Sequence, residues 1–202
     1  MGSEGLGQHM SDGFPVVANM ERYLLAERFT QATYLVPFGF WTKGLDPERL
    51  RRAFDETVAA HPILRTDFVA SGTGFAGRPA TDWPSMIEFD WTGADDETVR
   101  TWLIAALFTK SPELTARNFV KTICAKIGED RHIIVFSLHH GLSDGMSASI
   151  YMREIAARYN GEPPATADRT YWDVMAGPPT GVQPEEARRF WTESLAALHD
   201  LP

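Results

Sequence analysis

The sequence predicts a mixed α/β domain, and three observations support this fold class. Segments with the apolar spacing of a helix alternate with short runs rich in β-branched and aromatic residues. Of the 202 residues, 44% are hydrophobic and 23% are charged, a composition typical of a folded globular chain rather than a disordered one. The sequence contains no internal repeat and no low-complexity run, which argues against a repeat architecture.

The helices are predicted from capping residues and from apolar residues that recur on one face. Asp46-Pro47 combines a capping side chain with a proline suited to the first turn. Asp95-Asp96 marks another helix start, and for that helix we expect a core face of Val99, Trp102, Leu103, Ala106 and Leu107. The predicted helices cover residues 16–28, the stretch between Asp46-Pro47 and His61-Pro62, the stretch that begins at Asp95-Asp96, residues 145–159 and residues 184–199.

The strands are predicted from β-branched and aromatic runs that end at turn residues. They cover residues 33–41, 64–70, 86–91, 119–127 and 132–138, and the last two form a β-hairpin around Gly128-Glu129-Asp130-Arg131. Pro37 lies inside the first strand and indicates an edge position or a bulge. We expect loops at residues 71–84 and 162–183, where glycines, prolines or small residues accumulate.

Charge and cysteine content exclude several classes of partner. The net charge is −8, whereas nucleic acids and anionic membrane surfaces select a basic face. No apolar stretch is long enough to span a membrane, and we expect no signal peptide from the first residues. The single cysteine, Cys124, cannot form an intramolecular disulfide, and we expect it to be a small buried hydrophobic residue in a reducing, cytoplasmic protein.

The segment 137–147 carries the residues best suited to chemistry. It lies between a predicted strand and a predicted helix, where α/β folds place reactive groups. Because successive side chains of a strand point to opposite faces, one of His139 and His140 can be buried while the other faces a cleft. Asp144 follows within the turn, and Gly145 has no side chain to block a slender ligand.

Three interpretations of this segment are open on the residues alone. One histidine could act as a general base, with Asp144 as a buried organiser. The histidines and the carboxylate could bind a metal, as in non-haem iron sites, although adjacent histidines in a strand diverge and chelate one ion poorly. The third interpretation is a hydrogen-bonded pair of histidines at a strand end without any chemical role.

The sequence of this segment resembles a known family. Residues 139–145 (HHGLSDG) match the HHxxxDG signature of the condensation domains of nonribosomal peptide synthetases and of related acyltransferases of the chloramphenicol-acetyltransferase-like superfamily. Further resemblances follow in the family's order: residues 61–68 (HPILRTDF) to its H-x-x-LRTxF motif, residues 171–174 (YWDV) to YxDY, and residues 190–195 (FWTESL) to the yWxxxL helix. Residues 18–23 (ANMERY) are a degraded first motif, with Asn19 and Glu21 in place of its glutamine and arginine.

The resemblance implies a chloramphenicol-acetyltransferase-like lobe, in which a mixed β-sheet carries helices packed on its outer side. Family domains are about twice as long and consist of two lobes around a tunnel. We therefore expect residues 1–10 to be a tag remnant, 11–161 the N-terminal lobe, and 162–202 the linker and crossover helix towards a missing C-terminal lobe, in cis or in trans. The isolated lobe is expected to be inactive alone.

The resemblance also implies an activity and the residues that perform it. The intact domain would form an amide bond between an acyl or peptidyl thioester on a donor carrier protein and an aminoacyl group on an acceptor carrier protein. His140 would be the catalytic residue, supported by His139 and Gly145 and by a buried salt bridge between Asp144 and Arg65. The chain itself would bind no metal and no cofactor, because the carrier proteins present the 4'-phosphopantetheine.

Two other functions fit the same residues. One is an ester-forming acyltransferase of the same superfamily, which uses a free alcohol. The other is a non-catalytic module that only docks carrier proteins or a partner lobe. An epimerisation domain shares the histidine motif, but the match at residues 61–68 argues against it.

Overall fold

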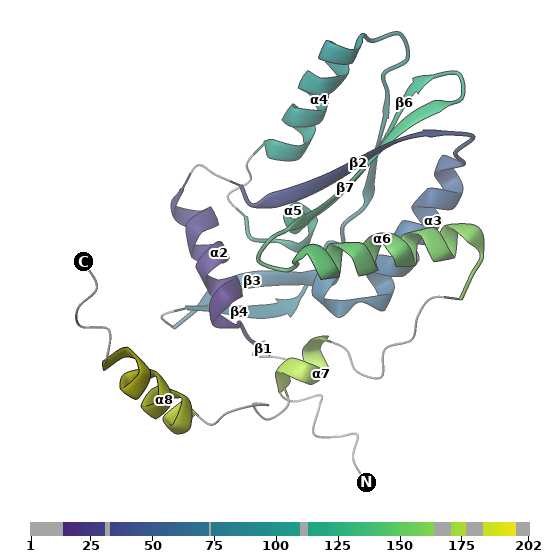
Figure 1. Cartoon of the computed structure of the whole chain (residues 1–202). Coiled ribbons are helices and arrows are strands. Elements are labelled where there is room, and N and C mark those ends of the chain that lie inside the picture. The colour runs from purple at the N-terminus through teal and green to yellow at the C-terminus, as the bar shows by residue number, and fades with distance from the viewer. Residues whose placement is uncertain are drawn as a thin grey trace.

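A four-stranded mixed sheet forms the centre of the molecule. The computed structural model describes residues 14–30, 33–72, 74–109, 113–163, 171–176 and 184–196. The strand order is β2-β7-β6-β5, with bounds Leu35–Lys43 for β2, Arg131–His139 for β7, Val120–Gly128 for β6 and Met86–Asp90 for β5 (Figure 1). Strand β7 pairs antiparallel with both neighbours and β5 pairs parallel with β6, so the predicted mixed sheet and hairpin are confirmed. Pro37 lies on the edge strand β2, as expected.

Helices cover both faces of this sheet. The bounds are Ala18–Phe29 for α2, Pro47–Ala60 for α3, Asp96–Phe108 for α4, Ala116–Phe119 for α5, Gly145–Asn160 for α6, Tyr171–Ala176 for α7 and Pro184–Ala196 for α8. Phe54 of α3 and Ile155 of α6 pack on Ile134 of β7, whereas Val99 of α4 packs on the opposite face with Ile133. The side-chain carboxylates of Asp46 and Asp95 cap α3 and α4, as the sequence indicates.

The prediction for one residue of α4 is wrong. Helical spacing places Trp102 in the core, but 42% of it is exposed. The core of this face is filled by Val99 and Leu107 of the same helix, and the Trp102 ring instead lies at the rim, 5.5 Å from the Trp91 ring. Cys124 is buried as expected, and burial raises the pKa of its thiol to about 11.

A second sheet corrects the sequence prediction of a loop at residues 71–84. It has the order β1-β4-β3, with bounds Phe14–Pro15, Gly74–Pro79 and Thr66–Ser71, and it is antiparallel throughout. The glycines and the proline of β4 give it a low strand propensity, but pairing on both sides with β1 and β3 overrides that propensity. The predicted strand 64–70 starts later than expected because a 3₁₀ helix, η1 (Pro62–Arg65), precedes it.

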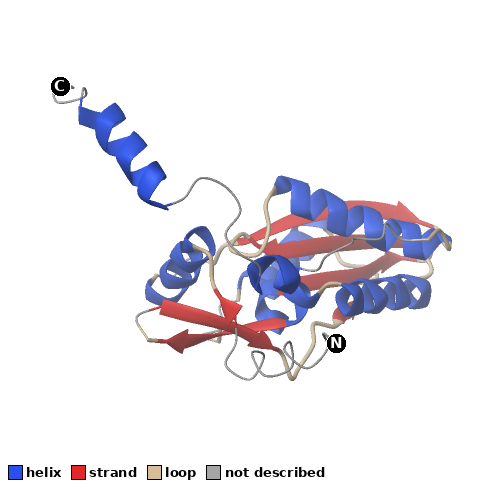
Figure 2. Ribbon diagram, turned by 90° about the horizontal axis from the view of Figure 1, so that it is seen from below, coloured by secondary structure: helices blue, strands red, loops and turns tan. Residues whose placement is uncertain are grey.

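Helix α2 packs on this second sheet and thereby reaches the end of β7. Its Met20 and Leu24 share a cluster with Phe68, Phe75 and Phe119, and Figure 1 shows α2 beside β3 and β4. Both views show α8 projecting away from the two sheets (Figures 1 and 2). The exposed side of α8 includes Phe190, Trp191 and Leu195.

Several expectations fall outside what the structure covers. Residues 1–10, residues 164–170 and 177–183 of the predicted loop, and residues 197–199 of the last predicted helix lie outside the described residues. The loop prediction is wrong at Tyr171–Ala176, which form helix α7. Within the described ranges, none of the helices has both the length and the apolar character needed to cross a membrane.

Candidate active site

The two motif histidines occupy different environments at the end of β7. His139 is 1% exposed, whereas His140 is exposed at the start of the turn that leads to α6. The expected burial of one ring is confirmed, and the other ring is exposed. The alternation follows from the extended backbone, which turns consecutive side chains to opposite sides.

The position of His140 is fixed by three contacts. Its Nδ1 atom lies 3.0 Å from the carbonyl oxygen of Ser143, and its backbone N–H donates to the carbonyl oxygen of Tyr34 at 2.8 Å. The Tyr23 ring stacks on the imidazole, with centroids 4.9 Å apart and planes 11° apart. A carbonyl oxygen can only accept, so Nδ1 must carry the hydrogen and Nε2 of the neutral ring keeps a lone pair.

His139 has the opposite arrangement of hydrogen and lone pair. Its Nδ1 accepts the backbone N–H of Gly141 at 3.0 Å, so the hydrogen of the neutral ring is on Nε2. Burial, assisted by His140, lowers the pKa of His139 to about 4, which keeps the ring neutral near pH 7. The carbonyl oxygen of His139 accepts from Leu142 N–H at 2.9 Å and from the Ser143 hydroxyl at 3.1 Å. His139 therefore organises the turn that carries His140.

Gly141 is a residue that the sequence reasoning did not single out. A Cβ atom at this position would lie 2.9 Å from His139 Nδ1 and 3.2 Å from Tyr23 Cβ. The backbone passes so close to both residues that only glycine fits without displacement.

Asp144 caps α6 and is exposed. Its carboxylate accepts the backbone N–H and the hydroxyl of Ser147, both at 2.8 Å. The hydrogen bond from the Ser147 backbone N–H, followed by that from the Ser147 hydroxyl, holds the pKa of Asp144 below its usual range. Asp144 thus fixes the start of α6 directly after the histidine turn.

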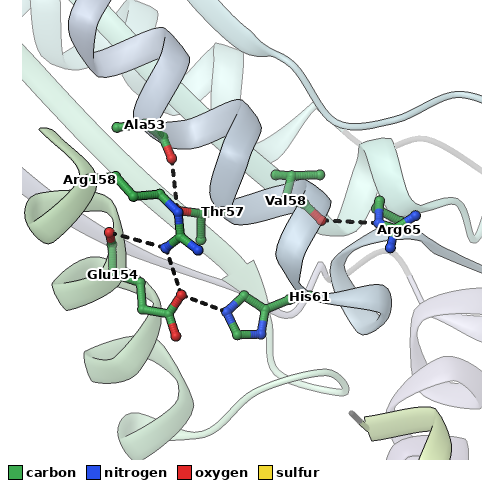
Figure 3. A network of polar contacts seen from close by, with 7 residues as sticks. All are labelled: Ala53, Thr57, Val58, His61, Arg65, Glu154 and Arg158. Atoms are coloured by element: carbon green, nitrogen blue, oxygen red, sulfur yellow. Dashed lines mark hydrogen bonds and ion pairs between the residues drawn. The ribbon is translucent and has the colours of Figure 1, made fainter. Parts of the chain in front are cut away.

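The expected salt bridge between Asp144 and Arg65 is wrong. Arg65 Nε donates to the carbonyl oxygen of Val58 at 3.1 Å (Figure 3). The Arg65 guanidinium also lies 4.5 Å from the centroid of the Trp83 ring. Among the described residues, neither side chain forms an ion pair with the other, because Asp144 turns to its own helix start and Arg65 to the end of α3. Arg65 therefore stabilises η1 and the end of α3 rather than the histidine turn.

The histidine of the H-x-x-LRTxF motif belongs to a separate polar network. His61 Nε2 lies 2.9 Å from Glu154 Oε2, and Arg158 Nη1 donates to the same oxygen at 2.7 Å (Figure 3). This network ties the end of α3 to α6, the helix that Asp144 caps. The i,i+4 spacing of Glu154 and Arg158 is a sequence pattern for an ion pair within one helix, but no pattern indicates the contact of this pair with His61.

Open space surrounds Gly145. Among the described residues, a Cβ atom at this first residue of α6 would have no contact within 4 Å beyond its chain neighbours and the backbone of its own helix. A slender group can therefore approach the backbone here, close to His140 in the chain. In the part of the chain that the structure describes, no three His, Cys, Asp or Glu side chains converge as a metal site would require.

A comparison of the sequence with models of known families identifies the family of this chain. The family model described as "Condensation domain" matches residues 15–202. The chain belongs to the condensation-domain family. The match includes the histidine turn, the His61–Phe68 motif and α8.

Curated relatives are synthetases far longer than this chain. Gramicidin S synthase 2 of Aneurinibacillus migulanus is 28% identical over 155 residues, which is 74% of this chain and 3% of the relative. Bacitracin synthase 1 of Bacillus licheniformis is 23% identical over 191 residues, which is 92% of this chain and 4% of the relative. This condensation-domain chain thus spans a small part of the curated relatives it matches.

Solved structures show the same fold. A mutant starter condensation domain of rhizomide synthetase RzmA in complex with C8-CoA matches with a TM-score of 0.76 and 20% identity, covering 96% of this chain and 48% of that one. The cyclization-docking bidomain of EpoB from Sorangium cellulosum matches with a TM-score of 0.71 and 21% identity, covering 91% and 39%. The predicted chloramphenicol-acetyltransferase-like fold is confirmed, and the chain spans about half the length of the condensation domain that it matches.

Proposed function

We propose that this chain supplies His140 to amide-bond formation between a carrier-bound acyl or peptidyl thioester and a carrier-bound aminoacyl group. The observation that carries the proposal is the 3.0 Å contact between His140 Nδ1 and the carbonyl oxygen of Ser143. Because Nδ1 donates to the Ser143 carbonyl, the lone pair of Nε2 is available on an exposed, oriented ring. An imidazole in this state can accept a proton from an amine or hold the amine by a hydrogen bond.

A single histidine can carry the proton through the whole reaction. The amine nitrogen of the acceptor attacks the thioester carbonyl carbon and forms the C–N bond. His140 Nε2 takes a proton from the attacking nitrogen, the C–S bond breaks, and the departing thiolate receives that proton from His140, which returns to its neutral form. Since a free α-amine has a pKa near 8, solvent deprotonates a useful fraction of it, so orienting the amine contributes beside proton transfer.

The remaining site residues support this chemistry by position. His139 and Asp144 fix the two ends of the turn, and the open space at Gly145 suits the narrow arm of a phosphopantetheine. The donor and acceptor carrier proteins would present that group covalently, so it reaches the site as part of the substrate. Arg65 would act further away, through the stability of η1 and α3.

We further propose that catalysis needs a second lobe, in cis or in trans. Support comes from the coverage, since the chain corresponds to 48% of the solved starter condensation domain. It also comes from α8, whose Phe190, Trp191 and Leu195 are more than half exposed, and apolar residues at this spacing on a helix suit a packing partner.

The test is a condensation assay read by mass spectrometry. An acylated donor carrier is mixed with an acceptor carrier that bears either an amine or a hydroxy group, and the protein is supplied as the 202-residue chain and as a longer protein with the second lobe. We expect an amide product from the longer protein, none from the chain alone, and loss of product in His140→Ala with unchanged circular dichroism.

Three results would contradict this account in different ways. Amide product from the 202-residue chain alone would show that one lobe suffices. Product only with the hydroxy acceptor would identify an ester-forming enzyme. No product from either protein, together with retained binding of carriers, would identify a docking module.

A further inference from the structure

Glu27 is a buried carboxylate that the proposed chemistry does not use. It lies near the end of α2 and is 6% exposed, on the same side of the helix as the buried Met20 and Leu24. A carboxylate among core residues is costly unless polar groups compensate it. The contacts of Glu27 therefore show which polar groups compensate its burial.

Two groups of the histidine site face the Glu27 carboxylate. Oε2 accepts the backbone N–H of Tyr34 at 3.2 Å, and the same oxygen lies 3.7 Å from His139 Nε2. In the described part of the chain, this buried Nε2 atom has no hydrogen-bond partner, and 3.7 Å is longer than a hydrogen bond. The Glu27 carboxylate is thus the acidic group that lies beside this Nε2 atom.

Both ends of the Tyr34 residue take part in this arrangement. Its N–H donates to Glu27, and its carbonyl oxygen accepts the backbone N–H of His140 at 2.8 Å. The Tyr34 ring also lies edge-on to Tyr23, at 5.4 Å between centroids, and Tyr23 stacks on His140. Glu27 is therefore connected to His140 through Tyr34 as well as through His139.

The charge on Glu27 opposes the alternative tautomer of His139. If the hydrogen of His139 moved to Nδ1, it would meet the N–H of Gly141, and the Nε2 lone pair would face a carboxylate. The charge of Glu27 also acts on Lys121 of the neighbouring strand β6. Burial lowers the pKa of Lys121, and the attraction to Glu27 raises it in part. Both contacts of His139 thus favour hydrogen on Nε2.

We propose that Glu27 is a positioning residue, whose carboxylate fixes His139 in the Nε2–H tautomer and thereby holds the turn that presents His140. Only the catalytic consequence rests on the proposed function; the tautomers are properties of this chain itself. Glu27 touches no reacting atom in this proposal. It acts through His139, Gly141 and Tyr34.

The experiment reads the tautomers directly. Long-range ¹H–¹⁵N correlation spectra of the ¹⁵N-labelled 202-residue chain are recorded for the unmodified protein, for Glu27→Gln, and for Glu56→Gln as a control at an exposed glutamate of α3. We expect hydrogen on Nε2 of His139 and on Nδ1 of His140 in the unmodified chain and in the control. In Glu27→Gln, we expect loss of the single His139 tautomer and about tenfold faster hydrogen exchange at the Gly141 amide.

A catalytic measurement in the two-lobe protein complements the spectra. Glu27→Gln should lower kcat about tenfold with little change in KM for the acyl donor, because the ring of His140 is less well oriented. If the unmodified two-lobe protein forms no product, the proposed function fails while the spectra still decide the role of Glu27.

Two findings would overturn the proposal. One is hydrogen on Nδ1 of His139 in the unmodified chain, which can be observed even if Glu27→Gln does not fold. The other is a folded Glu27→Gln chain with the same His139 tautomer and the same Gly141 exchange rate as the unmodified protein.

Discussion

His139 and His140 are adjacent in one motif, but their ring nitrogens contact different groups, and their chemistry differs for this reason. His139 accepts a backbone N–H through Nδ1 and is buried, whereas His140 donates to a carbonyl through Nδ1 and is exposed. Only the second ring keeps a lone pair that substrate can reach. The difference between the two histidines therefore has two sources: consecutive side chains of a strand point to opposite sides, and the turn after β7 supplies a different backbone partner to each ring.

Replacement of Tyr23 tests the stacking contact on His140. Tyr23→Leu removes the ring that stacks on the imidazole at 4.9 Å, so the imidazole gains freedom to rotate. We expect kcat of the two-lobe protein to fall about 10- to 100-fold. Tyr23→Phe keeps the ring and should retain most activity. Equal loss in both variants would show that the hydroxyl, not the stacked ring, matters.

Replacement of Asp144 distinguishes a helix cap from a salt bridge. Because the carboxylate caps α6 at an exposed position, Asp144→Ala should lower the melting temperature by only about 2–4 °C, and Asp144→Ser should restore most of it. Thermal unfolding followed by circular dichroism measures both. A loss several times larger, matched by Arg65→Ala, would favour the buried ion pair that the sequence resemblance implies.

Replacement of Gly145 separates access from folding. Since a Cβ atom at this position has no contact with the described residues within 4 Å beyond its chain neighbours and the backbone of its own helix, Gly145→Ala and Gly145→Leu should both fold normally. In the two-lobe protein, the leucine should block condensation and the alanine should slow it less, because the larger side chain fills the approach to His140. Full activity of a folded Gly145→Leu protein would place the substrate arm elsewhere.

At the scale of elements, the site depends on how α3 and α6 are held together. Glu154 of α6 contacts both Arg158 and His61, and the side chains of Glu154 and Arg158 are 9% and 8% exposed. Burial alone would raise the pKa of Glu154, but the hydrogen bonds from Arg158 and His61 outweigh it, so the pKa is lowered. The charged carboxylate thus stabilises the packing of the helix that Asp144 caps.

Loss of this carboxylate should destabilise the fold. Glu154→Ala leaves Arg158 without its ionic partner and should cost about 3 kcal/mol of unfolding free energy, measured in urea. Arg153→Ala, at an exposed position of the same helix, is the control and should cost little. An equal effect of the two replacements would contradict a role for the network.

The same network predicts a pH dependence of stability. The pKa of Glu154 in the folded protein is below its ordinary value of 4.5, so its contribution is present above about pH 4.5 and is lost as the pH falls through the folded-state pKa. The difference in unfolding free energy between the unmodified chain and Glu154→Gln should therefore shrink in acid. A difference that stays constant between about pH 6 and about pH 3 would exclude this origin.

The sequence predicts most elements of the large sheet but not the second sheet. Capping residues at Asp46 and Asp95 and the β-branched strands β6 and β7 carry local signals that the structure retains. Strand β4 directly follows β3, with Ser71 paired to Gly74, but its own glycines and proline give it a low strand propensity. Its other partner, β1, lies far away in the sequence, so the complete second sheet has no local pattern.

The same limit applies to the site. The motif identifies His139 and His140, but the partners from α2 and from the chain before β2 come together only in three dimensions. One signal is present in the sequence: Glu27 follows Met20 and Leu24 at helical spacing, which places a carboxylate at a core position. The predicted salt bridge of Asp144 is wrong because the local hydrogen bonds from Ser147 satisfy its carboxylate.

At the scale of the whole molecule, the chain has the architecture of half a condensation domain. Its fold carries the histidine turn in full, with both ends of the turn fixed by its own residues. It corresponds to 48% of the solved starter condensation domain, and the apolar residues of α8 are exposed. We therefore expect this chain to orient the proton acceptor, and the second lobe to complete the enclosure of the substrates.

A crystal structure of the two-lobe protein with an amine-bearing acceptor analogue bound would show whether His140 contacts the amine. We expect the amine nitrogen within about 2.6–3.2 Å of His140 Nε2, while Nδ1 still contacts the Ser143 carbonyl. An amine that contacts another group, or a His140 ring turned so that Nδ1 faces the amine, would contradict this expectation.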